Sequence, residues 1–364
     1  MDPSSYRGAV LEKNRLRRGI LVALAVSAAT LVCLSLFTID RETFSALSHL
    51  SPGILALAVA ISLGRWFLSA LRMRLILGGL GRKLPLVALI KTVYGGYFTG
   101  LITPWRAGGI TGEAVFLYLY GIPAGEAAAA ISFGASISTM LLLLLFPWTI
   151  ILSSRYINLN FTFKGFMFSA LGIGVIFLSL VLLAMARAGS LDTEKLVERS
   201  PGFLKRKAAY VRWVGKLVRE IGRFSRSLKL LFKLRFIEIL SVIFCSVAFW
   251  LLGFMVVPTV LVGLGYPRHF GQAVLAQLVV QLLMPFVPVP GGSGVGELGF
   301  FWLYQRFLPE PGIASVLTLA WRFIDFYLGL LVGGVFFMWI MKDVGSPRTP
   351  PYRGLPQDGG DGGR

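Results

Sequence analysis

The stretch PWRAGGITGEAVFLYLY at Pro104–Tyr120 returns later in the chain as PVPGGSGVGELGFFWLY at Pro288–Tyr304. Aligned without a gap, the two stretches share seven of seventeen residues, more than the roughly one expected from average amino-acid usage. The shared pairs are Pro104 and Pro288, Gly108 and Gly292, Gly112 and Gly296, Glu113 and Glu297, Phe116 and Phe300, Leu119 and Leu303, and Tyr120 and Tyr304. We interpret this match as an internal duplication.

Both copies have the same plan: an apolar stretch, a break rich in proline and glycine, a Gly-Glu pair and a short aromatic helix. The breaks are marked by Pro104 in the first copy and by Pro288 and Pro290 in the second. Backbone that leaves helical geometry at membrane depth must find hydrogen-bond partners in protein or in a water-filled cavity. The duplication therefore predicts a polar cavity beside the breaks, the alternative being a purely structural pair of hairpins.

The composition of the whole chain indicates a polytopic membrane protein. The chain has 364 residues, of which 55% are hydrophobic, too many for the surface of a soluble globule. Six stretches match the roughly 20 apolar residues of a spanning helix. They are Ile20–Ile39, Thr43–Gly64, Ala127–Ile151, Gly165–Ala186, Ile239–Leu264 and Ile313–Met341.

Charge predicts how these six helices are oriented. The segment Arg187–Arg235 carries fourteen Lys or Arg residues against four acidic ones, so the positive-inside rule places it in the cytoplasm together with both termini. Two segments remain, Leu84–Tyr120 and Phe270–Tyr304, and each must enter and leave on one side of a cell (plasma or inner) membrane. Because three crossings separate them, we expect an all-α fold with an inverted-topology repeat and two broken, re-entrant helical hairpins.

The expected organisation has three parts. Residues 1–19 form a basic cytoplasmic N-terminus, residues 20–341 the transmembrane domain with repeat halves at about 43–186 and 239–341, and residues 342–364 a disordered tail. Residues 187–236 form a cytoplasmic amphipathic segment, which packs either on the membrane domain or a partner, or on anionic phospholipid. Its apolar face comprises Tyr210, Val214, Leu217, Ile221, Phe224, Leu228 and Leu231, and its basic face Arg212, Lys216, Arg219, Arg223, Arg226 and Lys233.

The breaks and their flanks resemble the flippase-like transmembrane domain of lysylphosphatidylglycerol synthetases, including members that lack the synthetase domain. The residues that carry the resemblance are Gly95-Gly96-Tyr97-Phe98, Pro104 with Gly108, Gly109, Gly112 and Glu113, the run Pro288 to Glu297, and Arg322-x-x-Asp325. The resemblance implies translocation of an aminoacyl-phospholipid or a polyprenyl-linked lipid, with membrane lipids as partners. It departs at Phe133–Thr139, which has no Arg-x-x-Asp. Since no transferase domain is present, a separate enzyme would modify the lipid.

The glycine-rich breaks are the first candidate for substrate binding. Free N–H groups at a helix start attract a phosphate, which singles out Gly108, Gly109, Gly112, Gly291, Gly292 and Gly296. Arg106 could add a bidentate contact to this phosphate. Only the first copy could do so, because Pro290 occupies the equivalent position in the second copy.

Four charged residues complete the candidate site. Glu113 and Glu297, expected in the first turn of each short helix, serve either as helix caps or as cavity-facing groups for a cation or a proton. Arg322 and Asp325 form either a mutual ion pair or a phosphate-binding arginine held by an aspartate. We expect Glu297→Gln and Arg322→Ala to stop translocation without harming folding.

Other polar residues indicate neither an enzyme nor a metal site. Cys33 and Cys245 lie far apart in apolar stretches, and His49 and His269 lack neighbouring ligands, so we expect no metal, cofactor or disulfide. Lys91 is expected to reach the cytoplasmic interface, and Gln272, Gln277 and Gln281 to bond between helices. The basic cytoplasmic segments explain the net charge of +19, so it does not indicate that the protein binds nucleic acid. A homo-oligomer, an ion-coupled transporter of a small solute and a membrane-embedded lipid transferase stay open as alternatives.

Overall fold

The computed structural model describes residues 51–156 and 208–345, together with isolated helical positions between 165 and 179. The predicted span at Ile20–Ile39, most of that at Gly165–Ala186, and residues 346–364 of the C-terminal tail lie outside the described residues, as do Cys33 and His49. Residues 342–345, predicted to be disordered with the tail, are instead the end of a helix. Within the described ranges every regular element is a helix, in agreement with the expected all-α class.

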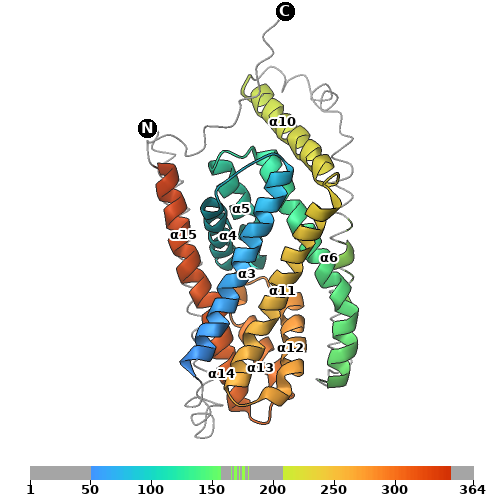
Figure 1. The fold of residues 1–364 in the computed structure, drawn as a ribbon, viewed down its shortest axis with the longest axis vertical. Coiled ribbons are helices and arrows are strands. Elements are labelled where there is room, and N and C mark those ends of the chain that lie inside the picture. Colours follow the sequence, from blue (N-terminus) through green and yellow to red (C-terminus); the bar gives the residue numbers. More distant parts are fainter. Residues whose placement is uncertain are drawn as a thin grey trace, which may run out of the picture.

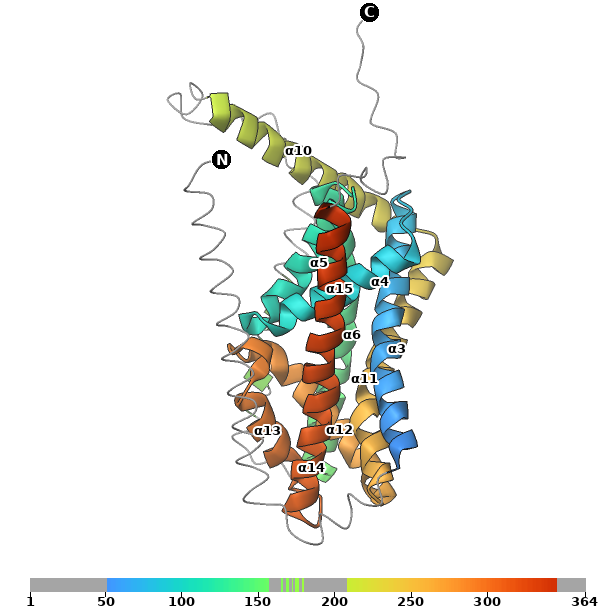
Figure 2. The same cartoon turned by 90° about the vertical axis from the view of Figure 1, so that its left-hand side faces the viewer.

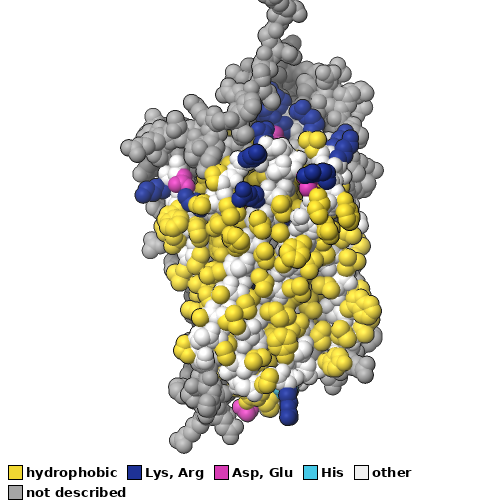
Figure 3. Space-filling model, viewed as in Figure 1, with side chains coloured by type: hydrophobic (Ala, Val, Ile, Leu, Met, Phe, Trp, Pro, Cys, Tyr) yellow, Lys and Arg dark blue, Asp and Glu magenta, His cyan; other side chains and the backbone are white. Residues whose placement is uncertain are grey.

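Among the described residues, four helices have the length and the apolar composition needed to cross a membrane. They are α3 (Pro52–Gly79), α6 (Ala124–Tyr156), α11 (Phe236–Gly263) and a composite of α14 (Pro311–Arg322), the π-helical turn η5 (Phe323–Tyr327) and α15 (Leu328–Gly345). Figure 3 shows a broad hydrophobic band across the face in view, with most Lys and Arg of that face gathered at one end. This distribution suits a helical bundle surrounded by lipid.

The predicted span Thr43–Gly64 covers only part of its helix. The described part of this region begins with the N-cap Ser51, and α3 continues past Gly64 through Arg65 and Arg72 to Gly79. The predicted span ends at Gly64 because the next residue, Arg65, is charged. Arg65 can lie inside the helix because its guanidinium meets a carboxylate, Asp325, from another helix.

Between the long helices lie two hairpins, each made of two short helices and a break. The first consists of α4 (Leu86–Leu101), the turn η1 (Pro104–Arg106) and α5 (Ala107–Leu119). The second consists of α12 (Phe270–Leu283), the turns η3 (Met284–Phe286) and η4 (Pro290–Gly292), and α13 (Val295–Tyr304). Figure 2 shows the first hairpin in the half of the molecule next to the helix α10 (Ala208–Leu231) and the second in the opposite half.

The two sets of elements match in order, and their long helices match in length. Helices α3 and α11 have 28 residues each, and one constant offset of 184 residues relates their ends as well as the starts of α4 and α12. Both long helices end in the same way, with Leu-Gly and a left-handed glycine at Gly81 and Gly265, the conformation that glycine adopts most readily at a helix end. Figure 1 shows that α3 and α11 run in opposite directions.

The bundle is centred on the contact between α3 and α11, while α4 packs on α15 and α5 on α4. The predicted amphipathic helix is confirmed as α10 (Ala208–Leu231), which lies across one end of the bundle and packs on α6. Its Leu228 and Leu231 are buried, whereas Arg219 and Arg226 are exposed. The described part of α10 thus presents its apolar face to the bundle and basic residues outward.

Candidate functional site: an ion network where the two breaks meet

The two breaks touch each other near the middle of the bundle, where η1 contacts both η3 and η4. In η1, Trp105 and Arg106 have φ values of 52° and 55°, a left-handed conformation that non-glycine residues rarely adopt. In η4, glycines occupy the positive-φ positions Gly291 and Gly292. Strained backbone at Arg106 positions the start of α5 and the arginine side chain at this junction.

Asp325 lies at the centre of the first group of charges. Its Oδ1 accepts a hydrogen bond from Nη2 of Arg65, and its Oδ2 lies 3.8 Å from Nη2 of Arg106. The hydroxyl of Tyr97 donates to the backbone carbonyl of Asp325. Arg65 and Asp325 are only 3% and 5% exposed. Arg65 from α3 and Arg106 from the first break thus meet at the buried carboxylate of Asp325 in η5.

Glu297 and Arg322 form the second group. Nε of Arg322 lies 2.7 Å from Oε1 of Glu297, and Nη1 donates to the carbonyl of Gly291 at 2.8 Å. The other carboxylate oxygen of Glu297 accepts from the amide of Gly294 at 2.7 Å. Glu297 is therefore fully buried and caps its helix, which is one of the two roles predicted for it, with Arg322 as the cation beside it.

The predicted ion pair between Arg322 and Asp325 is wrong, because each residue has another partner. Arg322 ends α14, and Asp325 lies in the π-helical turn that follows. A π-helical turn is wider than an α-helical one, so residues three apart no longer share a face. The turn thereby directs Arg322 to the second hairpin and Asp325 to α3 and the first break.

The network contains more positive than negative groups. Arg65, Arg106 and Arg322 carry three guanidinium groups against the two carboxylates of Glu297 and Asp325. In the described part of the chain, Arg65 Nε, Arg106 Nε, Arg322 Nη2 and Ser293 Oγ are buried without a hydrogen-bond partner. Buried donors of this kind normally find a partner, so the site is suited to an anionic or strongly accepting ligand.

Two of the amides predicted to be free, those of Gly108 and Gly292, donate hydrogen bonds within the protein. Gly108 donates to Oγ1 of Thr103, Gly292 to the carbonyl of Val289, and Gly294 to Glu297. A Cβ atom at Gly108 would lie 2.5 Å from the carbonyl oxygen of Thr99, and one at Gly112 would lie 2.2 Å from the hydroxyl of Thr99, whereas one at Gly109 would make only ordinary contacts. Gly108 and Gly112 therefore allow α5 to pack closely on α4.

The prediction that Glu113 lies in the first turn of its helix is wrong, because α5 begins at Ala107, directly after the break. Glu113 packs against Gly96, where a Cβ atom would approach Glu113 Cγ to 2.4 Å. The positive charge of Arg72 in α3 has an electrostatic effect on the carboxyl group of Glu113. The first copy thus places its glutamate deeper in the helix than the second copy does.

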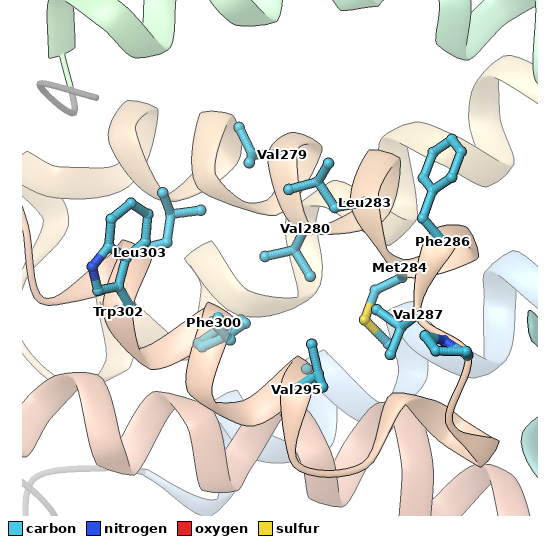
Figure 4. Close-up of a pocket in the computed structure, with 13 residues that line it drawn as sticks. Val279, Val280, Leu283, Met284, Phe286, Val287, Val295, Phe300, Trp302 and Leu303 are labelled. Carbon is cyan, nitrogen blue, oxygen red and sulfur yellow. The ribbon is translucent and has the colours of Figure 1, made fainter. Parts of the chain in front are cut away.

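An apolar cavity of about 290 Å³ lies between α12 and α13, beside the second break. Figure 4 shows Val280, Leu283, Met284, Val295 and Phe300 around it. Gly296 also lines this cavity, and a Cβ atom there would lie 3.5 Å from Nη2 of Arg322. The apolar space therefore borders the charged network.

The remaining polar residues have mainly structural surroundings. Lys91 forms an ion pair with Asp343 at 2.6 Å, and Gln272 donates to the carbonyl of Tyr156. Gln277 and Gln281 are buried, and Cys245 is buried with a free thiol. Among the described residues, no group of three or more His, Cys, Asp or Glu side chains could hold a metal ion.

Arg65 and Tyr97 were not identified as site residues from the sequence. Arg65 lies one residue beyond the predicted span Thr43–Gly64, and Tyr97 belongs to the motif Gly95-Gly96-Tyr97-Phe98. One signal was available: Ser62, Arg65, Ser69 and Arg72 recur at spacings of three and four, which places polar side chains on one face of an apolar helix.

Comparisons with known proteins agree with this architecture. The sequence model of the lysylphosphatidylglycerol synthase TM region matches residues 20–333. A UPF0104 membrane protein from Archaeoglobus fulgidus is 26% identical over 326 residues, which cover 87% of this chain and 94% of that protein. No solved structure matches. The chain thus belongs to the family of the lysylphosphatidylglycerol synthase transmembrane region.

Proposed function

We propose that this protein moves a phosphate-bearing lipid headgroup between the two leaflets of a cell membrane, acting as a carrier and not as an enzyme. The observation that carries the proposal is the buried network of Arg65, Arg106, Asp325, Glu297 and Arg322 at the contact between the two breaks. An excess of guanidinium groups favours a phosphate, and arginine binds phosphate oxygens with two parallel hydrogen bonds.

The proposal includes an inverted-topology repeat with two re-entrant hairpins. Its support is the constant offset between α3 and α11 and between α4 and α12, together with the opposite directions of α3 and α11. Broken helices that meet near the midplane from opposite leaflets are typical of alternating-access transporters. In this arrangement the network lies between the leaflets, where a headgroup passes on its way across.

The apolar cavity beside Gly296 supports a lipid over a small water-soluble solute. It borders Arg322, so a headgroup at the network could keep part of a hydrocarbon chain in the space between α12 and α13. The basic end of the molecule, which includes α10, is proposed to face the cytoplasm and its anionic lipids. Aminoacyl-phospholipids and polyprenyl-linked lipids both fit this scheme.

Leaflet exchange in proteoliposomes tests the proposal directly. The protein is reconstituted with a headgroup-labelled phospholipid, and a membrane-impermeant quencher reports how much label becomes accessible from outside. We expect vesicles with protein to expose label from both leaflets and empty vesicles from one. Equal quenching in both preparations, across aminoacyl, anionic and polyprenyl phosphate lipids, would contradict the proposed function.

A further inference from the structure

Arg72 lies in α3 two turns beyond Arg65 and is the centre of a second polar cluster. Its Nη1 donates to the hydroxyl of Ser138 on α6 and, at 3.3 Å, to that of Ser246 on α11. Its Nη2 lies 3.4 Å from the hydroxyl of Ser69. Three membrane-spanning helices thus bring neutral hydroxyl groups to one guanidinium group.

The charge of Arg72 is not neutralised in the way that the other buried arginines are. In the described part of the chain, no ion pair joins Arg72 to a carboxylate, whereas Arg65 pairs with Asp325 and Arg322 with Glu297. Glu113 has an electrostatic effect on Arg72, but no hydrogen bond or ion pair joins the two among the described residues. Hydroxyl groups satisfy hydrogen bonds but leave the charge, and an uncompensated charge away from water is costly.

Arg72 reaches the helix of the first half that corresponds to the helix carrying Arg322. Arg322 ends α14, which follows α13, and Arg72 contacts Ser138 on α6, which follows α5. One turn earlier, a Cβ atom at Gly134 would lie 3.6 Å from Nε of Arg72. The arginine missing from the first half is therefore supplied from α3, on the same side as Glu113, the counterpart of Glu297.

We propose that Arg72, Ser69, Ser138 and Ser246 form a second binding station for the phosphate group of a lipid, on the α10 side of the central network. This inference rests on the proposed function, which it deepens by giving the headgroup one arginine station in each half. Seven residues of α3 separate Arg65 from Arg72, so the stations differ in depth by about 10 Å.

The surroundings of Ser138 favour a lipid over a free phosphate ion. On the same helix, Leu141 and Leu142 lie one turn beyond Ser138 on the same face and are partly exposed, which places apolar side chains beside the cluster. Arg72 as a residue is also partly exposed. A headgroup can approach it from the lipid side while its chains remain among apolar side chains.

The test measures ligand-dependent thermal stability in detergent with two probes, dihexanoyl phosphatidylglycerol and inorganic phosphate. The variants are Arg72→Gln, which removes the charge, Arg72→Lys, which keeps the charge but not the fork of donors, and Arg74→Gln as a matched control. Arg74 lies on the same helix but is exposed. We expect at least a tenfold weaker apparent affinity for the lipid probe in Arg72→Gln, a smaller loss in Arg72→Lys and wild-type affinity in Arg74→Gln.

Stability without probe separates a binding role from a structural one. A binding station predicts that Arg72→Gln melts at or above the wild-type temperature, because the uncompensated charge is gone. A clear loss of stability with unchanged affinity would overturn the inference, as would equal affinity of the wild type for inorganic phosphate and the lipid probe. If the wild type exchanges lipid between leaflets and Arg72→Gln binds normally, only this inference fails. Absence of exchange in the wild type contradicts the proposed function instead.

Discussion

Arg322 Nε lies 2.7 Å from Glu297 Oε1 in a pair whose two side chains are 1% and 0% exposed. A buried pair of this kind stabilises the protein little in total, but removing one partner leaves the other charge without compensation. Glu297 also accepts the amide hydrogen bond of Gly294 that starts α13. The pair therefore joins the second break to α14 through both charge and helix capping.

Glu297→Gln is expected to lower the free energy of unfolding by about 3–5 kcal/mol, the usual effect of breaking a buried ion pair. This expectation replaces the earlier one that the substitution leaves folding intact. In the double variant Glu297→Gln with Arg322→Gln, part of the loss should be recovered because no charge is left unpaired. Thermal unfolding in detergent measures both, and a double variant that is less stable than each single variant would contradict this reading.

Asp325→Asn should slow leaflet exchange at least tenfold, because Arg65 and Arg106 lose the carboxylate that holds them at the junction of the breaks. Asp343→Asn is the matched control: it removes an aspartate from the same composite helix, at its end, where the partner is Lys91. The proteoliposome assay compares the two at equal amounts of inserted protein. Equal rates in both variants would show that the central position has no special role.

Gly291→Ala should destabilise the fold by about 2 kcal/mol or more, since φ is 61° and a Cβ atom would lie 2.2 Å from the ring of Phe326. Gly299→Ala, in the helix that follows, has no atom within 4 Å of the added Cβ. It should stay within about 1 kcal/mol of the wild type. Melting temperatures of the two variants provide the comparison, and equal values would rule out close packing at Gly291.

Cysteine labelling checks the proposed inverted topology. Lys83 between α3 and α4 and Arg268 between α11 and α12 are both exposed and hold nearly equivalent places in the two halves. In a background without Cys33 and Cys245, Lys83→Cys and Arg268→Cys should react with an impermeant maleimide from opposite sides of the membrane. Reaction of both from one side would exclude an inverted repeat and, with it, two hairpins that meet from opposite leaflets.

The sequence by itself determined the class of protein and the position of both breaks. Apolar length predicts the helices at Ala127–Ile151, Ile239–Leu264 and Ile313–Met341, because a membrane-spanning helix has a minimum length. The duplicated prolines and glycines mark the ends of helices because few other residues adopt such backbone angles. These signals are local, so they can be read from neighbouring residues.

Only the tertiary structure decided which charges belong together. Spacing along one helix suggested that Arg322 and Asp325 pair, whereas a π-helical turn and contacts from distant segments give them Glu297 and Arg65. A charged residue can lie inside a membrane helix when side chains from other segments compensate its charge or satisfy its hydrogen bonds. Its partner lies 260 residues away in the case of Arg65, and no local pattern encodes that distance.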